Sequence, residues 1–317
     1  MSQETGKPKY IIVLGTTYSG SGAVYDYLAA RGDLHDPLRG SEYLLPHAPH
    51  GLMALEAAAG PAFNPAVADH AVVRFLDLAR KLERHPTPWS YGRGYSKDLA
   101  SFYSHAERFI EEVSAAKMSM RMHWRVSERN SFEILLAKVL SLMGSKEEAK
   151  KTALLVDRER LVEKSRLMHD RVFLQSENSR PVLLNQAGSG WNPVESTKYF
   201  GDRRVVLVTR DPRDQFAELK MHKKACNVDE FIKWFRQLEY RINALDNSIV
   251  MRIGFENFVR EHDSWVAAIC GYLGVAPDVA SSYQLRDSAK NVGKYTLFLS
   301  KEEIFKIERC FPYCQGL

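Results

Sequence analysis

The segment that most constrains the fold of this chain is VLGTTYSGSGAVYDYL, residues 13 to 28. A hydrophobic run from Tyr10 to Leu14 leads into three glycines, and the apolar residues that follow recur at the three-and-four spacing of a buried helical face. This pattern predicts a strand, a tight loop and a helix. Backbone N–H groups at the start of such a helix lack intrahelical acceptors and lie at the positive end of the helix dipole. The loop therefore favours an anionic ligand such as a phosphate or a sulfate.

Strand patterns return in the second half of the chain. They occur at Pro181 to Gln186, Arg204 to Thr209 and Ser248 to Ile253, and a helical pattern at Asp229 to Leu245 lies between the last two. Strands that alternate with helices indicate a parallel sheet covered on both sides. We expect an α/β fold with a three-layer, P-loop-like parallel sheet flanked by helices.

The middle of the chain has little strand character. The charged stretch from about 97 to 172 predicts a helical insertion within a single domain of residues 1–317, and residues 46–66 and 85–96 are rich in Pro, Gly and His and are predicted to be loops. These segments are candidates for the acceptor pocket. Their aromatic residues are interpreted either as stacking surfaces for a ring or as core: Trp89, Tyr91, Tyr95 and Trp124.

Composition limits the class of protein. The 44 basic and 39 acidic residues give a net charge of +5, which suits a small anionic ligand as well as a nucleic acid. No nucleic-acid partner is expected, because the basic residues are spread among acids without a recognition motif.

No apolar stretch approaches the ~20 residues of a membrane span, and the N-terminus lacks a secretory pattern. The four scattered cysteines are interpreted as reduced packing residues. We expect a cytoplasmic protein, and the choice between a monomer and a homodimer stays open.

The glycine loop departs from a nucleotide-hydrolase P-loop in a specific way. The spacing from Gly15 to Gly20 begins that motif, but Ser21 and Gly22 stand where lysine and a magnesium-binding hydroxyl follow. A dinucleotide fingerprint fits worse, since Tyr25 stands where its third glycine is expected. A loop with this composition predicts a donor whose transfer needs no metal, and no metal site is expected.

A second motif, VVLVTRDPRDQFAELK at 205 to 220, predicts a strand followed by a capped helix. Asp211 is the expected N-cap, Pro212 stands at the first helical position, and Asp214 lies in the first turn. The strand would deliver Arg210 to the carboxyl edge of the sheet, where its planar fork can grip a phosphate. The alternative is a structural ion pair between Arg210 and Asp211. Two anion sites on one sheet indicate a nucleotide with phosphates at both ends.

Four segments together resemble the PAPS-dependent sulfotransferase family, especially its bacterial carbohydrate and small-molecule branches: SGSGAVYDYL, VTRDPRD, IGFENFV and NVGKYTLFLSKEEI. They cover both ends of the chain in the family's order and leave the middle unassigned. The resemblance implies that the first loop binds the 5′-phosphosulfate, that the arginine binds the 3′-phosphate, and that the last turn closes over it. GFENFV is chiefly structural in that family. The implied nucleotide-binding residues are Tyr18, Ser19, Gly20, Ser21, Gly22, Ala23, Arg210, Lys290, Asn291, Val292, Gly293 and Lys294.

The chain differs from the family at three of these places. Tyr18 replaces a basic residue before Ser-Gly, Glu218 replaces the serine eight residues after the arginine, and Tyr295 replaces an aromatic residue that is often tryptophan. The missing basic residue matters because, when the sulfuryl group is transferred, negative charge develops on the oxygen that leaves with the nucleotide, and this charge has to be stabilised. Candidates to replace it are the loop amides, the Tyr18 hydroxyl, Arg39 or a lysine of residues 220–224.

Transfer to a hydroxyl needs a base on the face opposite the nucleotide. The position of Glu42, in RGSEY, resembles that of the catalytic glutamate in carbohydrate-type sulfotransferases, so Glu42 is the first candidate for the base. The alternative is that Glu42 is a salt-bridged carboxylate of a loop. His47 and His50 are rivals, because histidine titrates near neutral pH, or they are polar loop residues. His123 is interpreted as part of a strand or of the edge of the core.

The predicted reaction is sulfuryl transfer from PAPS to a hydroxyl, less often an amine, of a carbohydrate or small-molecule acceptor, with release of adenosine 3′,5′-bisphosphate. Two alternatives stay open. A P-loop kinase of small molecules would use the same fold but needs the lysine and the magnesium ligand that this loop lacks. A nucleotide-binding module without catalysis is suggested by Tyr18 and Glu218.

Overall fold

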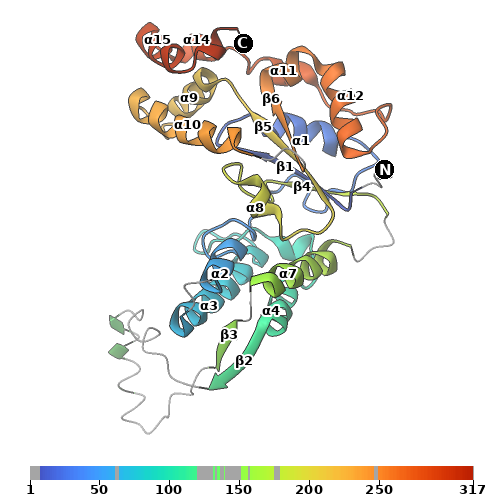
Figure 1. The fold of residues 1–317 in the computed structure, drawn as a ribbon, viewed down its shortest axis with the longest axis vertical. Coiled ribbons are helices and arrows are strands. Elements are labelled where there is room, and N and C mark those ends of the chain that lie inside the picture. The colour runs from blue at the N-terminus through green and yellow to red at the C-terminus, as the bar shows by residue number, and fades with distance from the viewer. Residues whose placement is uncertain are drawn as a thin grey trace. The chain divides into compact units, whose positions relative to one another are not determined.

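Four hydrophobic segments form one parallel sheet in the computed structural model of the chain (Figure 1). The structure describes residues 8–60, 64–119, 131–132, 134–135, 139, 151–155, 158–174, 179–245 and 249–316. The sheet order is β4-β1-β5-β6, and every pairing is parallel, with Val13 opposite Asn185 on one side and Val206 on the other. The strands are β1 (Tyr10–Gly15), β4 (Val182–Asn185), β5 (Arg203–Thr209) and β6 (Val250–Gly254).

The chain divides into two compact units, residues 1–44 with 176–317, and residues 45–175. The first unit holds the sheet. Its helices are α1 (Ser21–Ala29), α8 (Pro193–Thr197), α9 (Pro212–Met221), α10 (Val228–Asn243), α11 (Phe255–Arg260), α12 (His262–Leu273), α13 (Leu285–Ala289), α14 (Tyr295–Phe298), α15 (Lys301–Cys310) and the 3-10 turn η2 (Pro312–Gly316).

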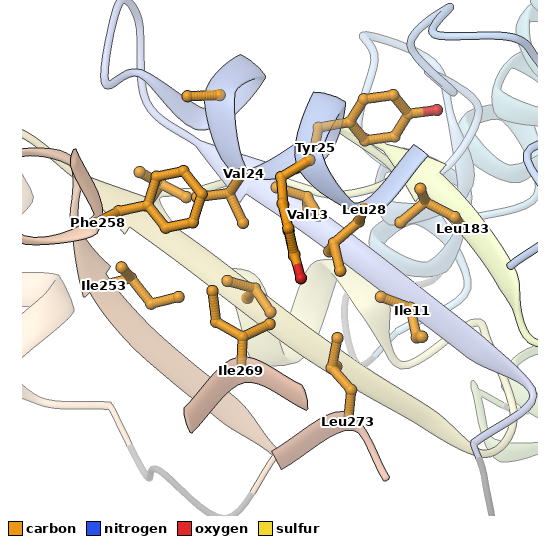
Figure 2. Close-up of a cluster of buried hydrophobic side chains, with 14 of the residues drawn as sticks. Ile11, Val13, Val24, Tyr25, Leu28, Leu183, Ile253, Phe258, Ile269 and Leu273 are labelled. Atoms are coloured by element: carbon orange, nitrogen blue, oxygen red, sulfur yellow. The ribbon is translucent and has the colours of Figure 1, made fainter. Parts of the chain in front are cut away.

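Helices cover both faces of the sheet, so the predicted three-layer α/β fold is confirmed. Alternate strand residues such as Ile11 and Val13 point to one face, where they meet Leu28 of α1 and Ile269 and Leu273 of α12 (Figure 2). On the other side of the sheet lie α9 and α10, which pack against each other and against α15 (Figure 1). Both faces of the central strands are therefore buried, which explains their continuous hydrophobic sequences.

The second unit is built on the helices α2, α3, α4 and α7. Phe75 and Phe109 pack with ring centroids 5.6 Å apart where α3 meets α4. An antiparallel pair, β2 with β3, accompanies the helices. The elements are α2 (Leu52–Ala58), α3 (Pro65–Glu83), the 3-10 turn η1 (Tyr95–Lys97), α4 (Phe102–Val113), β2 (Ser114–Ser119), β3 (Lys151–Leu155) and α7 (Arg158–Phe173).

Two expectations for this unit were wrong. Residues 46–66 are not all loop, because the helix-favouring run LMALEAA forms α2, and Asn64 caps α3 by accepting from the Ala66 N–H at 2.9 Å. The stretch 97–172 is not purely helical, since β2 and β3 pair across a long separation in sequence that a local pattern cannot reveal. His123 and Trp124 lie outside the described residues.

Two further observations concern the chemistry of the chain. All four cysteines are free thiols. Cys270 and Cys314 are buried, as expected of packing residues, whereas Cys226 is exposed, so its interpretation as a packing residue was wrong. Within the described ranges, no helix combines the length and the apolar character that crossing a membrane requires.

The strand order places a topological switch point between β1 and β5. After β1 the chain next enters the sheet at β4, on one side of β1, whereas after β5 it enters at β6, on the other side. Ligands of open α/β sheets bind where neighbouring connections diverge in this way, at the carboxyl ends of the strands. The glycine loop follows β1 and Arg210 follows β5, so both motifs reach this point.

Candidate active site

The glycine loop forms a tight turn at the start of α1. The Ser19 N–H donates to the Thr16 carbonyl at 2.9 Å, and Gly20 is the N-cap of the helix with φ 80°. The Ser19 hydroxyl is buried and has no hydrogen-bond partner among the described residues. The structure thus contains a helix N-terminus beside a buried hydroxyl without a partner, which fits an anionic group.

Two glycines leave the space for this turn. A Cβ on Gly15 would lie 2.6 Å from the Ser21 Oγ, and a Cβ on Gly20 would lie 2.5 Å from the ring of Phe255. Phe255 belongs to the segment GFENFV, for which the resemblance implied a structural role; it is buried, and its ring lies directly against the loop. Gly22, by contrast, has open space around its Cβ position.

We expect Gly20→Ala to lower the free energy of unfolding by roughly 2–5 kcal/mol, because a left-handed alanine is strained and its methyl group would overlap Phe255. Gly22→Ala is the matched control. It should change stability by less than about 1 kcal/mol, since alanine is the better helix former and nothing crowds it. Urea unfolding measures the stability of both variants. Equal losses of unfolding free energy would show that the turn of the glycine loop does not depend on Gly20.

Two glutamines hold the loop from both sides. Gln186, just after β4, accepts from the Gly15 N–H at 3.2 Å and donates to the Ser21 hydroxyl at 2.9 Å. Gln215 of α9 donates to the Thr16 hydroxyl at 3.1 Å and to the Thr17 carbonyl. Sequence reasoning missed both residues. The position of Gln186 at the end of a predicted strand could have indicated a place near the loop. No local pattern indicates the role of Gln215, because its partners lie almost 200 positions away in the sequence.

Arg210 joins the loop to the C-terminal turn. Its Nη1 donates to the Tyr18 carbonyl at 3.0 Å and its Nη2 to the Asn291 carbonyl at 2.6 Å. The guanidinium lies over the Phe255 ring at 5.2 Å, and its buried Nε has no partner among the described residues. Asp211 does not pair with Arg210; it caps α9 as predicted and binds Arg213. The structure brings the three predicted segments together around one guanidinium.

Asp214 fixes the turn at residues 290–294. Its carboxylate accepts from the Gly293 N–H at 2.7 Å and from the Tyr295 N–H at 2.8 Å. Burial raises the pKa of Asp214 above its usual value, although these two backbone bonds oppose the rise. Lys294 points toward the site, where its Nζ lies 3.2 Å from the Glu218 carboxylate, whereas the exposed Lys290 pairs with Asp287 on the outer side. Of the two lysines, Lys294 is therefore the one that lies near Arg210, with Glu218 close to both.

Tyr18, in the glycine loop, contacts two side chains at the end of α9 and just after it. Its ring stacks on His222 with centroids 5.0 Å apart, and the Lys224 ammonium lies 5.1 Å from its centroid. Lys220 instead pairs with Glu303 at 2.7 Å. Among the cations that the sequence offered as replacements for the missing basic residue, Lys224 is thus placed next to the loop by its contact with Tyr18.

Glu42 lies at the carboxyl edge of the sheet, on the side of β4 that faces away from β1. The segment around it runs parallel to β4, with Glu42 beside Asn185 and the Tyr43 N–H donating to the Asn185 carbonyl at 2.9 Å. Since strands lie about 4.8 Å apart, the half-buried Glu42 is two strand spacings from β1, at the level of Val13. His47 and the exposed His50 belong to the other unit of the chain, and their role as bases stays a prediction.

The described part of the chain contains no group of three or more His, Cys, Asp or Glu side chains arranged to hold a metal ion. The site instead offers backbone N–H groups, hydroxyls and the side chains of Arg210, Lys294 and Lys224, all of which can bind an anionic group.

No protein-family model matches the chain, and no curated protein matches it. Several solved structures are similar in fold. The sulfotransferase domain from the Synechococcus PCC 7002 olefin synthase is 12% identical, covering 99% of this chain and 98% of its own, with a TM-score of 0.45. The sulfotransferase domain from the curacin biosynthetic pathway has 12% identity, 96% and 98% coverage and a TM-score of 0.43. A Mycobacterium tuberculosis H37Rv sulfotransferase has 12% identity, 97% and 77% coverage and a TM-score of 0.36.

Proposed function

We propose that this chain is a sulfotransferase that uses PAPS as donor, transfers its sulfuryl group to a hydroxyl of a carbohydrate or small-molecule acceptor, and releases adenosine 3′,5′-bisphosphate. The observation that carries the proposal is the meeting of a lysine-free glycine loop with Arg210 and Lys294 at the point between β1 and β5 where the connections diverge. Two separate anion sites at one sheet edge suit a nucleotide that is charged at both ends.

The residues present fit such a nucleotide. The loop offers the N-terminal N–H groups of α1 and the buried Ser19 hydroxyl to a 5′-phosphosulfate. Arg210 has a buried Nε that is still available as a donor to a 3′-phosphate. Phe255 lies against both Gly20 and Arg210, so its ring would support both anion sites.

The donor supplies an activated sulfuryl group, and its transfer forms a bond from sulfur to the acceptor oxygen and breaks the bond from sulfur to the phosphate oxygen. Glu42 would take the proton of the acceptor hydroxyl, since it lies at the same sheet edge and is half-buried. Lys224, held over Tyr18, would stabilise the negative charge that develops on the phosphate oxygen.

Calorimetric titration with adenosine 3′,5′-bisphosphate, 5′-AMP and ATP with magnesium tests the proposal. We expect the bisphosphate to bind at least tenfold more tightly than 5′-AMP, because only the bisphosphate carries an anion for Arg210 and Lys294. We further expect labelled sulfate to pass from PAPS to members of an acceptor panel in the presence of EDTA. Preferential binding of ATP with magnesium would favour a kinase. Bisphosphate binding without transfer to any acceptor would favour a non-catalytic module.

A further inference from the structure

An acidic side chain already lies between the two cations of the proposed 3′-phosphate site. The Glu218 Oε1 is 3.6 Å from the Arg210 Nη2 and 3.2 Å from the Lys294 Nζ. The side chain of Glu218 is only 10% exposed and that of Arg210 only 4%. The carboxylate is therefore held at these cations, and both of them have a counter-ion before any ligand arrives.

An incoming phosphate cannot simply add to this arrangement. A phosphate held by Arg210 and Lys294 would place its negative charge within a few ångströms of the Glu218 carboxylate, and like charges that share a partly buried site disfavour each other strongly. The carboxylate competes for the same donors that the phosphate needs.

We propose that Glu218 is an internal counter-ion that occupies the 3′-phosphate position and has to move away from Arg210 and Lys294 before a 3′-phosphorylated nucleotide binds. The inference rests on the proposed function, since it concerns the same nucleotide site. Glu218 thereby sets how tightly the site holds the 3′-phosphate of donor and product.

The surroundings of Glu218 offer a place for the displaced carboxylate. Its second oxygen, Oε2, already lies 3.5 Å from the Nε2 of His222, one turn later on α9. The side chain of His222 is 47% exposed, so a carboxylate that turns toward it is nearer to solvent than one held at Arg210. The two cations then stay in place, with Lys294 on the turn that Asp214 fixes.

Glu218→Gln tests this inference, because glutamine keeps the shape of the side chain and removes its charge. We expect the dissociation constant of adenosine 3′,5′-bisphosphate to fall at least tenfold in Glu218→Gln, whereas that of 5′-AMP changes less than twofold. Glu218→Ser, with a smaller neutral side chain, should show the same gain. Glu230→Gln is the matched control, since Glu230 is an exposed residue at the start of α10 and its loss changes the net charge equally.

The outcomes separate this inference from the proposed function. If the wild type prefers the bisphosphate to 5′-AMP and neither Glu218 variant binds the bisphosphate more tightly, the counter-ion role is wrong and the nucleotide site stands. The counter-ion role is equally wrong if Glu230→Gln gives the same gain, because the effect is then one of overall charge. If neither the wild type nor any folded Glu218 variant binds either nucleotide, the proposed function is wrong, and this inference is wrong as well. Thermal unfolding identifies the folded variants, and Glu218→Ser carries the test if Glu218→Gln does not fold.

Discussion

Arg210→Ala should weaken the binding of adenosine 3′,5′-bisphosphate at least a hundredfold, while the dissociation constant of 5′-AMP rises only a few-fold. Each charge-assisted hydrogen bond contributes about 1.5–3 kcal/mol, and a fork that makes two of them to a phosphate accounts for roughly 3 kcal/mol or more, which corresponds to a factor of a hundred. Binding of 5′-AMP changes slightly, because Arg210 also holds the Tyr18 carbonyl of the loop. Calorimetry on both nucleotides measures the difference.

Two variants control this experiment. Arg286→Ala removes the same charge from an exposed position on α13 and should leave bisphosphate affinity within about threefold of the wild type. Arg210→Lys keeps the charge and loses the fork, so we expect an intermediate loss. A hundredfold loss in Arg286→Ala as well would mean that general electrostatic attraction, not contact with Arg210, governs binding. Thermal unfolding of Arg210→Ala is needed beside the calorimetry, because the side chain is buried and bonded to two carbonyls.

Glu42→Gln should lower kcat for sulfuryl transfer by about 10²–10⁴-fold, the contribution of a positioned general base. The dissociation constant of adenosine 3′,5′-bisphosphate should stay within about twofold, since Glu42 lies two strands away from the glycine loop. The rate is measured as transfer of label from PAPS to the best acceptor of the panel.

His47→Asn and His50→Asn compete directly with that assignment. Both variants keep a polar side chain, and we expect each to retain more than about a tenth of the wild-type kcat. A loss of a hundredfold or more in either histidine variant, with Glu42→Gln close to wild type, would move the role of base to that histidine. His50 has φ 68°, so asparagine, which tolerates left-handed backbone, is the suitable replacement there.

Local patterns predicted the first unit well. The hydrophobic runs at β1, β4, β5 and β6 became strands of one parallel sheet, because runs that are buried on both faces carry their signal in every residue. The cap of α9 was also predicted, since Asp211 accepts from the Arg213 N–H two residues later and needs no distant partner.

Other features depended on partners that are remote in sequence. Whether a segment pairs as β2 does with β3 is decided by the strand opposite, and the sequence of β2 carries no pattern of its own. The helix α2 was missed because its boundaries are prolines and glycines typical of loops, although the residues within it favour helix. The candidate base Glu42 was found by resemblance, but its position beside Asn185 comes from the sheet.

The sequence by itself determined the chemistry that this site offers: a glycine loop without the P-loop lysine, an arginine at the end of a strand, and a basic turn near the C-terminus. These are local properties, set by residue type and short spacing. Only the tertiary structure decided that Arg210 bonds to both other segments, that Gln186 and Gln215 hold the loop, and that Glu218 lies against Arg210 and Lys294. The physical reason is that ion pairs and hydrogen bonds act over a few ångströms of space, so their partners are fixed by how the sheet brings distant segments together.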